Sequence, residues 1–306
     1  MRALFLLLVI NLFTSESLSN HTNYEEGLAE FALDFAAAAY AVDPAKCIRK
    51  HGLSILIQAK VACDYAYDQC WAFVAYNDSI VVTAIRGTQT KLQLITELVE
   101  TMSAPKRPFP SGGSVQRYFY IAVKSLWKQG FGEKLKKLAE QLPNARFLFT
   151  GHSLGGALAS LTSSLFAFQQ KDKVTSDRIF LITFGQPRVG NMDYGAGHDS
   201  LVPQSWRLIH RYDIVAHLPY CYESLWSRQC SGLYNHGPYH HGTEIWYPES
   251  MGGTSNYLPL YRICNGTPQN EDQICSNSAY IHYNVADHLL YFNKTVSDYG
   301  EAGCPA

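Results

Sequence analysis

The stretch Phe149–Ser160 reads FTGHSLGGALAS and places a serine between two glycines, where an apolar run changes into a helical pattern. Gly151-His152-Ser153-Leu154-Gly155 matches G-x-S-x-G, which is typical of a sharp strand-to-helix turn that exposes a nucleophile. Glycine weakens a helix by about 0.5–1 kcal/mol relative to alanine, so its repetition here indicates a steric demand. The short pattern alone is common, but the strand-like run before it and the small-residue helix after it are the context that such a turn requires. The stretch therefore predicts a nucleophilic Ser153 at a helix N-terminus.

Strand and helix patterns alternate on both sides of this turn. Helical spacing is seen over residues 24–44, 114–130, 133–143 and 157–170. Strand-like runs cover residues 145–151, 178–185 and 205–213, and residues 70–87 read as two strands around a turn at Asn77-Asp78. Such alternation is typical of a mainly parallel sheet with helices on both faces. We therefore expect an α/β fold.

The first nineteen residues have the pattern of a secretory signal peptide. Arg2 precedes the apolar run Leu4–Phe13, and Ser17-Leu18-Ser19 offers a cleavage site of small residues. A membrane anchor is the alternative, but a span needs roughly 20 apolar residues, and no later segment reaches that length. We expect residues 1–19 to be removed and residues 20–306 to form a single secreted domain without a transmembrane segment.

The composition argues against a nucleic-acid partner. The formal net charge of the 306 residues is −1, so no overall basic character attracts phosphates. The lysines of residues 124–137 lack accompanying aromatic residues on which bases could stack, and they are best interpreted as a solvated helix face. The sequence predicts neither a cofactor nor a metal, and it leaves the oligomeric state open.

Eight cysteines follow the signal peptide, an even number that suggests disulfides in an oxidising compartment. Eight cysteines allow 105 pairings, so the connectivity is a hypothesis. Proximity in sequence favours Cys63–Cys70, Cys221–Cys230 and Cys264–Cys275, which leaves Cys47–Cys304 to join the two ends. A zinc site is the competing interpretation, but no C-x-x-C pair is present. Four sequons fit the same compartment, at Asn20, Asn77, Asn265 and Asn293.

A nucleophilic serine needs a base, and the base needs an orienting acid. In this kind of turn the acid and then the histidine follow the serine along the chain. Asp213 comes at the end of a strand-like run and is the preferred acid. Asp193 and Asp199 lie in a predicted polar loop and are weaker candidates, and Asp287 is badly placed to orient the histidine directly after it. The pattern leaves five histidines open: His236, His240, His241, His282 and His288.

Beyond these patterns, the whole chain after the signal peptide resembles the class 3 lipases, the family of the fungal triacylglycerol lipases, and most closely its secreted nematode-type members. The resemblance rests on an ordered set of motifs: TAIRGTQT, TGHSLGGALASL, LITFGQPRVGN, HRYDIVAHLP, YHHGTEIWYP and VADHLLYF. It implies an α/β-hydrolase fold, with a mainly parallel central sheet flanked by helices.

The resemblance also implies site residues. It makes Ser153 the nucleophile, Asp213 the orienting acid and His288 the base, and it leaves His217 and the His240/His241 pair as structural or supporting groups. One departure is Ala216, where the family often has proline before the histidine, which would loosen the loop after the acid. The implied oxyanion donors are the backbone N–H groups of Leu154 and, from Arg86-Gly87-Thr88, of Thr88.

A lid is implied directly after the second oxyanion donor. The segment Leu92–Ser103 contains Leu92, Leu94, Ile95, Leu98 and Val99, which group on one side of a helix. In related lipases a short helix here covers the active site, whereas the alternative is a helix packed on the core. An amphipathic lid suits a substrate that sits at a lipid–water interface.

The sequence thus predicts a secreted serine esterase acting on lipid esters, and acylglycerols in the first place. Phospholipids are the nearest competing substrates, and other carboxylic esters such as feruloyl esters occur in the same family. A secreted lipid-binding homologue without activity is the rival from another class, and the presence of all three triad residue types argues against it.

Overall fold

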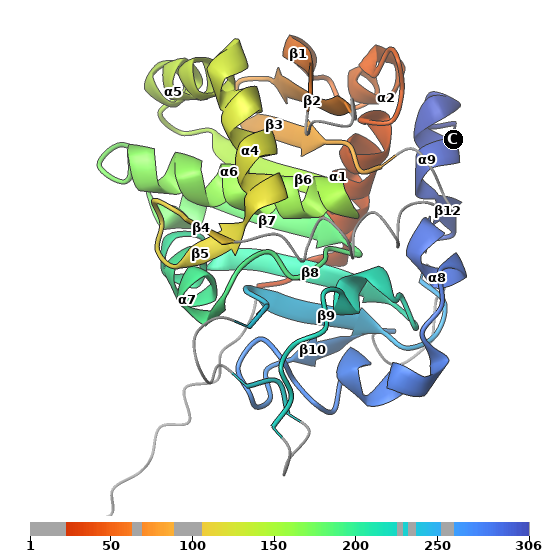
Figure 1. The fold of residues 1–306 in the computed structure, drawn as a ribbon. Helices are drawn as coiled ribbons and strands as arrows, with labels where there is room; N and C mark the ends of the chain where they lie inside the picture. Colours follow the sequence, from red (N-terminus) through yellow and green to blue (C-terminus); the bar gives the residue numbers. More distant parts are fainter. Residues whose placement is uncertain are drawn as a thin grey trace, which may run out of the picture.

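The computed structural model describes residues 23–62, 69–88, 106–224, 229–231, 237–251 and 260–305, with residues 280 and 281 for their backbone only. Through them runs a sheet of eight strands in the order β1-β2-β3-β6-β7-β8-β9-β10. Helices pack on both of its faces (Figure 1).

The strands of the large sheet are β1 (Ser54–Ala62), β2 (Gln69–Tyr76), β3 (Ile80–Ile85), β6 (Arg146–His152), β7 (Ile179–Phe184), β8 (Gln204–His210), β9 (Thr243–Tyr247) and β10 (Arg262–Cys264). Two small ladders pair β4 (Lys106–Pro108) with β5 (Ser114–Gln116), and β11 (Leu290–Tyr291) with β12 (Lys294–Thr295). The α-helices are α1 (Glu26–Ala38), α2 (Ala45–Arg49), α4 (Arg117–Leu126), α5 (Gly132–Gln141), α6 (Leu154–Gln170), α7 (Met192–Leu201), α8 (Ala286–Leu289) and α9 (Val296–Glu301). A π-turn (Trp127–Phe131) joins α4 to α5, and 3₁₀ turns occupy Ser176–Arg178, Val215–His217 and Ser276–His282.

The sheet is parallel in its centre and antiparallel at its edges. Strands β3, β6, β7, β8 and β9 pair in parallel, whereas β1-β2-β3 and β9-β10 pair antiparallel. The central strands are apolar and buried along almost their whole length, as expected of strands that are covered on both faces. The predicted mainly parallel sheet flanked by helices is therefore confirmed.

Two hydrophobic cores lie on the two faces of this sheet. Because side chains alternate along a strand, Phe147 and Phe149 of β6 face one core and Leu148 faces the other. The first core also receives α4, α5 and α6, and the second receives α1 and α9. Helix α6 is buried along nearly its entire length, which explains why its sequence has small residues all round.

One sequence prediction about this region is wrong. Residues 192–201, which contain Asp193 and Asp199, form α7 rather than a polar loop. Asn191 caps this helix by accepting a hydrogen bond from the backbone N–H of Tyr194. The cap outweighs the low helix propensity of the two glycines inside the helix.

The described residues contain three disulfides with both cysteines described: Cys47–Cys304, Cys221–Cys230 and Cys264–Cys275. The first joins α2 to the carboxyl-terminal end across a sequence separation of 257 residues, and long loops give the largest entropic stabilisation in chain-closure models. The pairing Cys63–Cys70 stays a prediction because Cys63 lies outside the described residues.

Several other expectations also fall outside the described residues: the signal peptide, the sequon at Asn20, His236, and the lid segment with Leu92, Leu94, Ile95, Leu98 and Val99. Of the remaining sequon residues, Asn265 and Asn293 are exposed, while Asn77 accepts two backbone hydrogen bonds in the turn between β2 and β3. Within the part of the chain that the structure describes, no helix combines the length and apolar character needed to cross a membrane.

Candidate active site

Ser153 sits in a strained turn between β6 and α6. Its backbone has φ 58° and ψ −129°, a conformation that non-glycine residues rarely adopt. The turn is held because the N–H of Ser153 donates to the carbonyl of Phe184, 2.9 Å away, on the neighbouring strand. A Cβ on Gly155 would lie 2.1 Å from the carbonyl oxygen of Ile85, so only glycine allows α6 to approach β3 this closely. The steric demand predicted from the sequence is therefore present.

The carboxyl ends of four parallel strands meet at the same edge as this turn. Ile85 of β3 is paired with Gly151 of β6, Gly151 with Thr183 of β7, and Thr183 with Arg207 of β8. The loops that leave these strands carry Thr88, Ser153, Gly185 and Asp213. This edge of an open α/β sheet is where ligands usually bind.

Asp213 and His288 form a buried pair at this edge. His288 Nδ1 lies 2.9 Å from Asp213 Oδ2 and 3.0 Å from Oδ1, and both side chains are fully buried. Two further donors hold the carboxylate, because the Tyr291 hydroxyl donates to Oδ2 at 2.6 Å and the Val215 N–H donates to Oδ1 at 2.8 Å. The carboxylate is therefore fixed in the plane where it accepts the Nδ1 proton of the imidazole.

The surroundings favour an ionised Asp213. Burial alone would raise its pKa, but the His288 ring, the hydrogen bond from that ring and the hydrogen bond from Tyr291 outweigh burial and lower the pKa to about 2. Burial and the same carboxylate raise the pKa of Tyr291 well above 10, so its hydroxyl stays a donor. A buried anion that is paired and hydrogen-bonded in this way can stabilise a positive charge on the imidazole.

Gly185 leaves room for this pair. Its φ is +57°, and a Cβ at this position would lie 2.4 Å from Asp213 Oδ2 and 2.7 Å from His288 Nδ1. Any side chain here would displace the acid or the histidine. The LITFGQPRVGN stretch therefore carries a glycine that serves the site, which sequence reasoning did not single out.

Two buried polar atoms of this region have no hydrogen-bond partner among the described residues. They are Ser153 Oγ and His288 Nε2. The ring of His288 stacks on that of His152, the residue before Ser153, with centroids 4.5 Å apart, so His288 lies beside the turn. Ser153 Oγ and His288 Nε2 do not form a hydrogen bond with each other in this structure. Contacts of this kind are often long without substrate and shorten in the Michaelis complex.

Two segments that carry the predicted oxyanion donors lie next to Ser153. Leu154 is the first residue of α6, where N–H groups have no acceptor within the helix. The loop after β3 also packs against the turn, since a Cβ on Gly87 would lie 3.1 Å from the Cβ of Ser153. Thr88 follows directly and is half-buried. The loop that carries the second predicted oxyanion donor thus lies against the predicted nucleophile.

The other histidine and aspartate candidates have different contacts. His217 stacks on Tyr283, His240 Nε2 donates to the carbonyl of Ala216 at 2.9 Å, and His241 Nε2 lies 2.8 Å from Ser160 Oγ. His282 is exposed.

Neither aspartate of α7 contacts the Asp213–His288 pair in the hydrogen bonds of the described residues. Asp193 is exposed, and Asp199 accepts from Gly242 N–H and Asn270. Asp287 accepts from the N–H of Tyr212 and from Asn284. Of these side chains, only Asp213 contacts the His288 ring.

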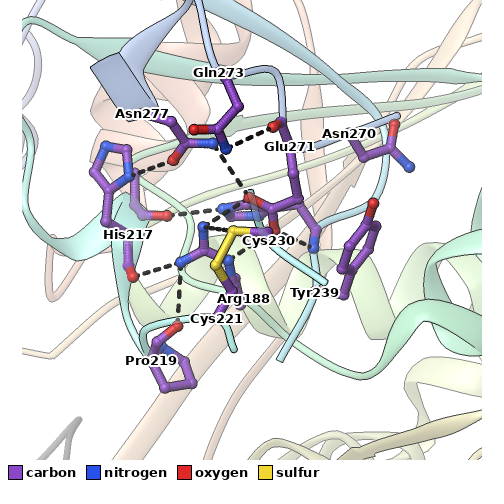
Figure 2. Close-up of a disulfide and its surroundings, with 12 residues drawn as sticks. Arg188, His217, Pro219, Cys221, Cys230, Tyr239, Asn270, Glu271, Gln273 and Asn277 are labelled. Atoms are coloured by element: carbon purple, nitrogen blue, oxygen red, sulfur yellow. Dashed lines mark hydrogen bonds and ion pairs between the residues drawn. A yellow bond between two sulfur atoms is a disulfide. The ribbon is translucent and has the colours of Figure 1, made fainter. Parts of the chain in front are cut away.

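A buried ion pair supports the loop that follows Asp213 (Figure 2). Arg188 and Glu271 bind in a two-pronged geometry, with Nε–Oε1 and Nη2–Oε2 both at 2.7 Å. Arg188 Nη1 also donates to the carbonyls of His217 and Pro219. The ion pair therefore fixes the segment that positions the acid, including the place where Ala216 replaces the family's proline. Sequence reasoning missed it, although the arginine stands in the LITFGQPRVGN motif.

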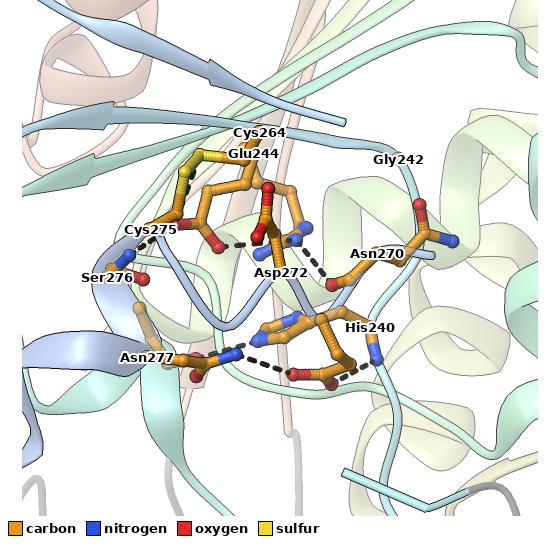
Figure 3. Close-up of polar contacts among 12 residues, drawn as sticks. His240, Gly242, Glu244, Cys264, Asn270, Asp272, Cys275, Ser276 and Asn277 are labelled. Carbon is orange, nitrogen blue, oxygen red and sulfur yellow. Dashed lines mark hydrogen bonds and ion pairs between the residues drawn. A yellow bond between two sulfur atoms is a disulfide. The ribbon is translucent and has the colours of Figure 1, made fainter. Parts of the chain in front are cut away.

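Near this ion pair, Glu244, Cys264 and Cys275 come close enough to suggest a metal site (Figure 3). The two sulfur atoms are bonded to each other, so neither is a thiolate that could ligate zinc. Glu244 instead accepts from the N–H of Ser276 at 3.0 Å and lies 3.8 Å from Arg207. The contacts of this cluster are those of a structural polar core.

With this geometry established, comparison with known proteins assigns the family. The family model for Lipase (class 3) matches residues 82–223. Lipase ZK262.3 of Caenorhabditis elegans is 33% identical, over 98% of this chain and 88% of that protein. The chain belongs to the class 3 lipase family. It is also 30% identical to a lipase of Rhizopus niveus over 73% of its own length, and this alignment spans about half (49%) of the Rhizopus protein.

A solved structure agrees with this assignment. The lipase is similar to a triacylglycerol lipase whose catalytic centre is described as a serine protease triad, with a TM-score of 0.69, 25% identity, and coverage of 90% of this chain and 97% of the other. The lipase therefore has the α/β-hydrolase fold, and it is a carboxylic ester hydrolase.

Proposed function

We propose that this lipase hydrolyses lipid esters, with Ser153 as nucleophile, His288 as base and Asp213 as orienting acid. The observation that carries the proposal is the buried Asp213–His288 pair near the strained turn of Ser153, in which His288 Nε2 has no hydrogen-bond partner among the described residues. An imidazole that is held at Nδ1 and open at Nε2 has the tautomer required of a general base.

The reaction follows from these positions. His288 Nε2 removes the proton of Ser153 Oγ as this oxygen attacks the ester carbonyl, and Asp213 stabilises the imidazolium that results. The imidazolium then gives its proton to the departing alcohol, which leaves an acyl-enzyme on Ser153. Finally His288 activates a water molecule, which releases the fatty acid and restores the serine.

The N–H groups of Leu154 and Thr88 stabilise the negative charge on the carbonyl oxygen. This assignment is supported by the position of Leu154 at the N-terminus of α6, where the helix dipole also favours negative charge. It is further supported by the close packing of the Gly87 loop on Ser153. Removal of one such donor typically costs about 10²–10³ in turnover.

We further propose acylglycerols as the substrate class, presented at a lipid–water interface. The support is the similarity to a solved triacylglycerol lipase. Secretion is proposed with it, since the amino-terminal pattern is that of a signal peptide and the three disulfides fit an oxidising compartment.

Replacement of Ser153 tests the chemistry. Ser153→Ala should lower kcat by about 10⁶-fold, the usual loss for such a nucleophile, and should abolish labelling by a fluorophosphonate probe. The control is Ser250→Ala, which removes an exposed serine hydroxyl and should change neither. Substantial turnover by Ser153→Ala would reject the assignment. Hydrolysis of triolein, phosphatidylcholine and methyl ferulate, each with and without an emulsified interface, separates the candidate substrates.

A further inference from the structure

His152 directly precedes the nucleophile, but its ring is engaged elsewhere. Its Nε2 lies 2.8 Å from the backbone carbonyl oxygen of His288, and its Nδ1 lies 2.8 Å from the hydroxyl of Tyr40. Both side chains are buried, with 4% of His152 and 3% of Tyr40 exposed. Neither residue has a role in the ester-hydrolysis steps above, so these contacts call for a separate explanation.

The chemistry of the partners fixes every proton in this arrangement. A carbonyl oxygen can only accept, so the proton of the His152 ring is on Nε2 and points at His288. Nδ1 then carries a lone pair, and the Tyr40 hydroxyl must donate to it. Burial, followed by the proximity of His288, lowers the pKa of His152 to about 3, which keeps the ring neutral and preserves this pattern at physiological pH.

The same Tyr40 oxygen packs against the backbone of Gly87, since a Cβ on Gly87 would collide with it. Gly87 immediately precedes Thr88, the proposed second oxyanion donor. A single phenol group, placed just after α1, therefore touches both halves of the site. It packs on the loop after β3, and it is hydrogen-bonded through His152 to the backbone of the general base.

The His152 ring also supports the imidazole of the base directly. The two rings are stacked at 4.5 Å with an interplanar angle of 28°. A neutral ring in this position limits the tilt of His288 without placing a positive charge next to the imidazolium that forms during catalysis. Gly185 approaches Nδ1 and Cε1 of the same imidazole, so the ring of His288 is tightly confined.

We propose that Tyr40 and His152 are positioning residues, which hold the proposed oxyanion loop and the His288 backbone in register. They act through the packing of the Tyr40 oxygen on Gly87 and through two hydrogen bonds, Tyr40 O–H to His152 Nδ1 and His152 Nε2–H to the His288 carbonyl. This inference rests on the proposed roles of Ser153, His288 and Thr88. The inference adds that Tyr40 and His152 together align the loop that carries Thr88 with the segment that carries His288.

Tyr40→Phe tests the chain because it removes the shared hydroxyl and keeps the ring. With a soluble p-nitrophenyl ester, we expect kcat to fall about 10- to 100-fold with little change in KM, since small misplacements of catalytic groups act on the reacting geometry. The matched control is Tyr24→Phe, which removes a buried hydroxyl bonded to Tyr247 at 2.8 Å and should leave kcat unchanged. An equal loss of kcat in both variants, or none in Tyr40→Phe, would overturn the inference.

Two variants of His152 separate positioning from packing. The amide nitrogen of His152→Gln can still donate to the His288 carbonyl, whereas His152→Leu cannot, so the glutamine variant should retain about tenfold more kcat than the leucine variant. Equal kcat values in folded forms of both would contradict the proposal. If either variant fails to fold, ¹⁵N NMR of the unmodified enzyme decides: His152 must be protonated on Nε2 and not on Nδ1, and the opposite tautomer would overturn the chain.

The outcome can be separated from that of the proposed function. Activity in Ser153→Ala would sink both. An inactive Ser153→Ala together with an unchanged kcat in Tyr40→Phe would sink the positioning chain alone.

Discussion

Two buried pairs of an acid and a base lie near each other in this lipase, and their environments differ. Arg188–Glu271 is saturated, because Nε, Nη1 and Nη2 of the arginine all donate and both carboxylate oxygens accept. Asp213–His288 is saturated only at the carboxylate, while His288 Nε2 has no partner among the described residues. The first pair has no atom left to offer a substrate, and the second has one.

The difference between the two pairs shows what each buried carboxylate contributes to the lipase. A saturated pair stabilises one arrangement of the chain, here the segment that follows the acid, and breaking it leaves an uncompensated charge. In the proposed function, a proton moves at the open nitrogen of the second pair, where an unsatisfied buried atom is otherwise costly. On that proposal the Arg188 pair contributes stability and the His288 pair contributes chemistry, and substitutions in the two pairs test this division.

The largest effect is expected from Asp213→Asn. An amide cannot accept both the Nδ1 proton and the donors from Tyr291 and Val215 in the present arrangement, so the imidazole would adopt the wrong tautomer. We expect kcat to fall about 10⁴-fold, measured on a soluble ester, with the melting temperature changed far less than that loss suggests. A variant that loses its fold instead of its turnover would place Asp213 among the stabilising charges.

Glu271→Gln should have the converse effect. It leaves the buried Arg188 guanidinium without its charge partner, and we expect the free energy of unfolding to fall by about 3–5 kcal/mol, measured by urea denaturation. The folded enzyme should keep kcat within about tenfold of the original. The control is Glu140→Gln, which breaks an exposed ion pair with Lys173 (2.7 Å) and should have little effect. A kcat loss comparable to that of Asp213→Asn would end the distinction between the two pairs.

Acid should lower the free energy of unfolding through both regions alike, and by less per pH unit than the loss expected for Glu271→Gln. Burial, aided by His288 beside His152 and by Arg188 beside His217, lowers the pKa of each ring to about 3. Between pH 6.5 and 3 the unfolded chain therefore binds protons that the folded lipase does not, and the free energy of unfolding falls as the pH falls. Each ring contributes about 1.4 kcal/mol per pH unit.

The measurement is urea denaturation at a series of pH values in this window. His217→Gln should reduce the slope of the free energy of unfolding against pH by the contribution of one protonation, about 1.4 kcal/mol per pH unit. A variant with an unchanged slope would show that His217 is already protonated in the folded lipase. Asp213, with a pKa near 2, acts in the same direction below about pH 4, because its stabilisation is lost as the carboxylate protonates.

Sequence patterns predicted best those features that depend on residues close together in the chain. The turn at Ser153 and the parallel strands were predicted because a sharp strand-to-helix turn and buried strands leave local patterns in the sequence. Asp213 was preferred because it follows a strand. His288 could not be chosen from spacing, and only the family resemblance singled it out among five histidines. Helix α7 was missed because the cap at Asn191 outweighs the glycines that suggested a loop.

The α/β class, the place of the turn and the residue types available for catalysis could be predicted from the sequence, because they follow from local periodicity and from the steric limits of glycine. Which side chains meet depends on the folded chain. Tyr40 and His152 are 112 residues apart in the sequence, His152 and His288 are 136 apart, and Arg188 and Glu271 are 83 apart. No local pattern records such contacts. They exist because the parallel strands end at one edge, and the packing of that edge selects which side chains are left with an atom to use.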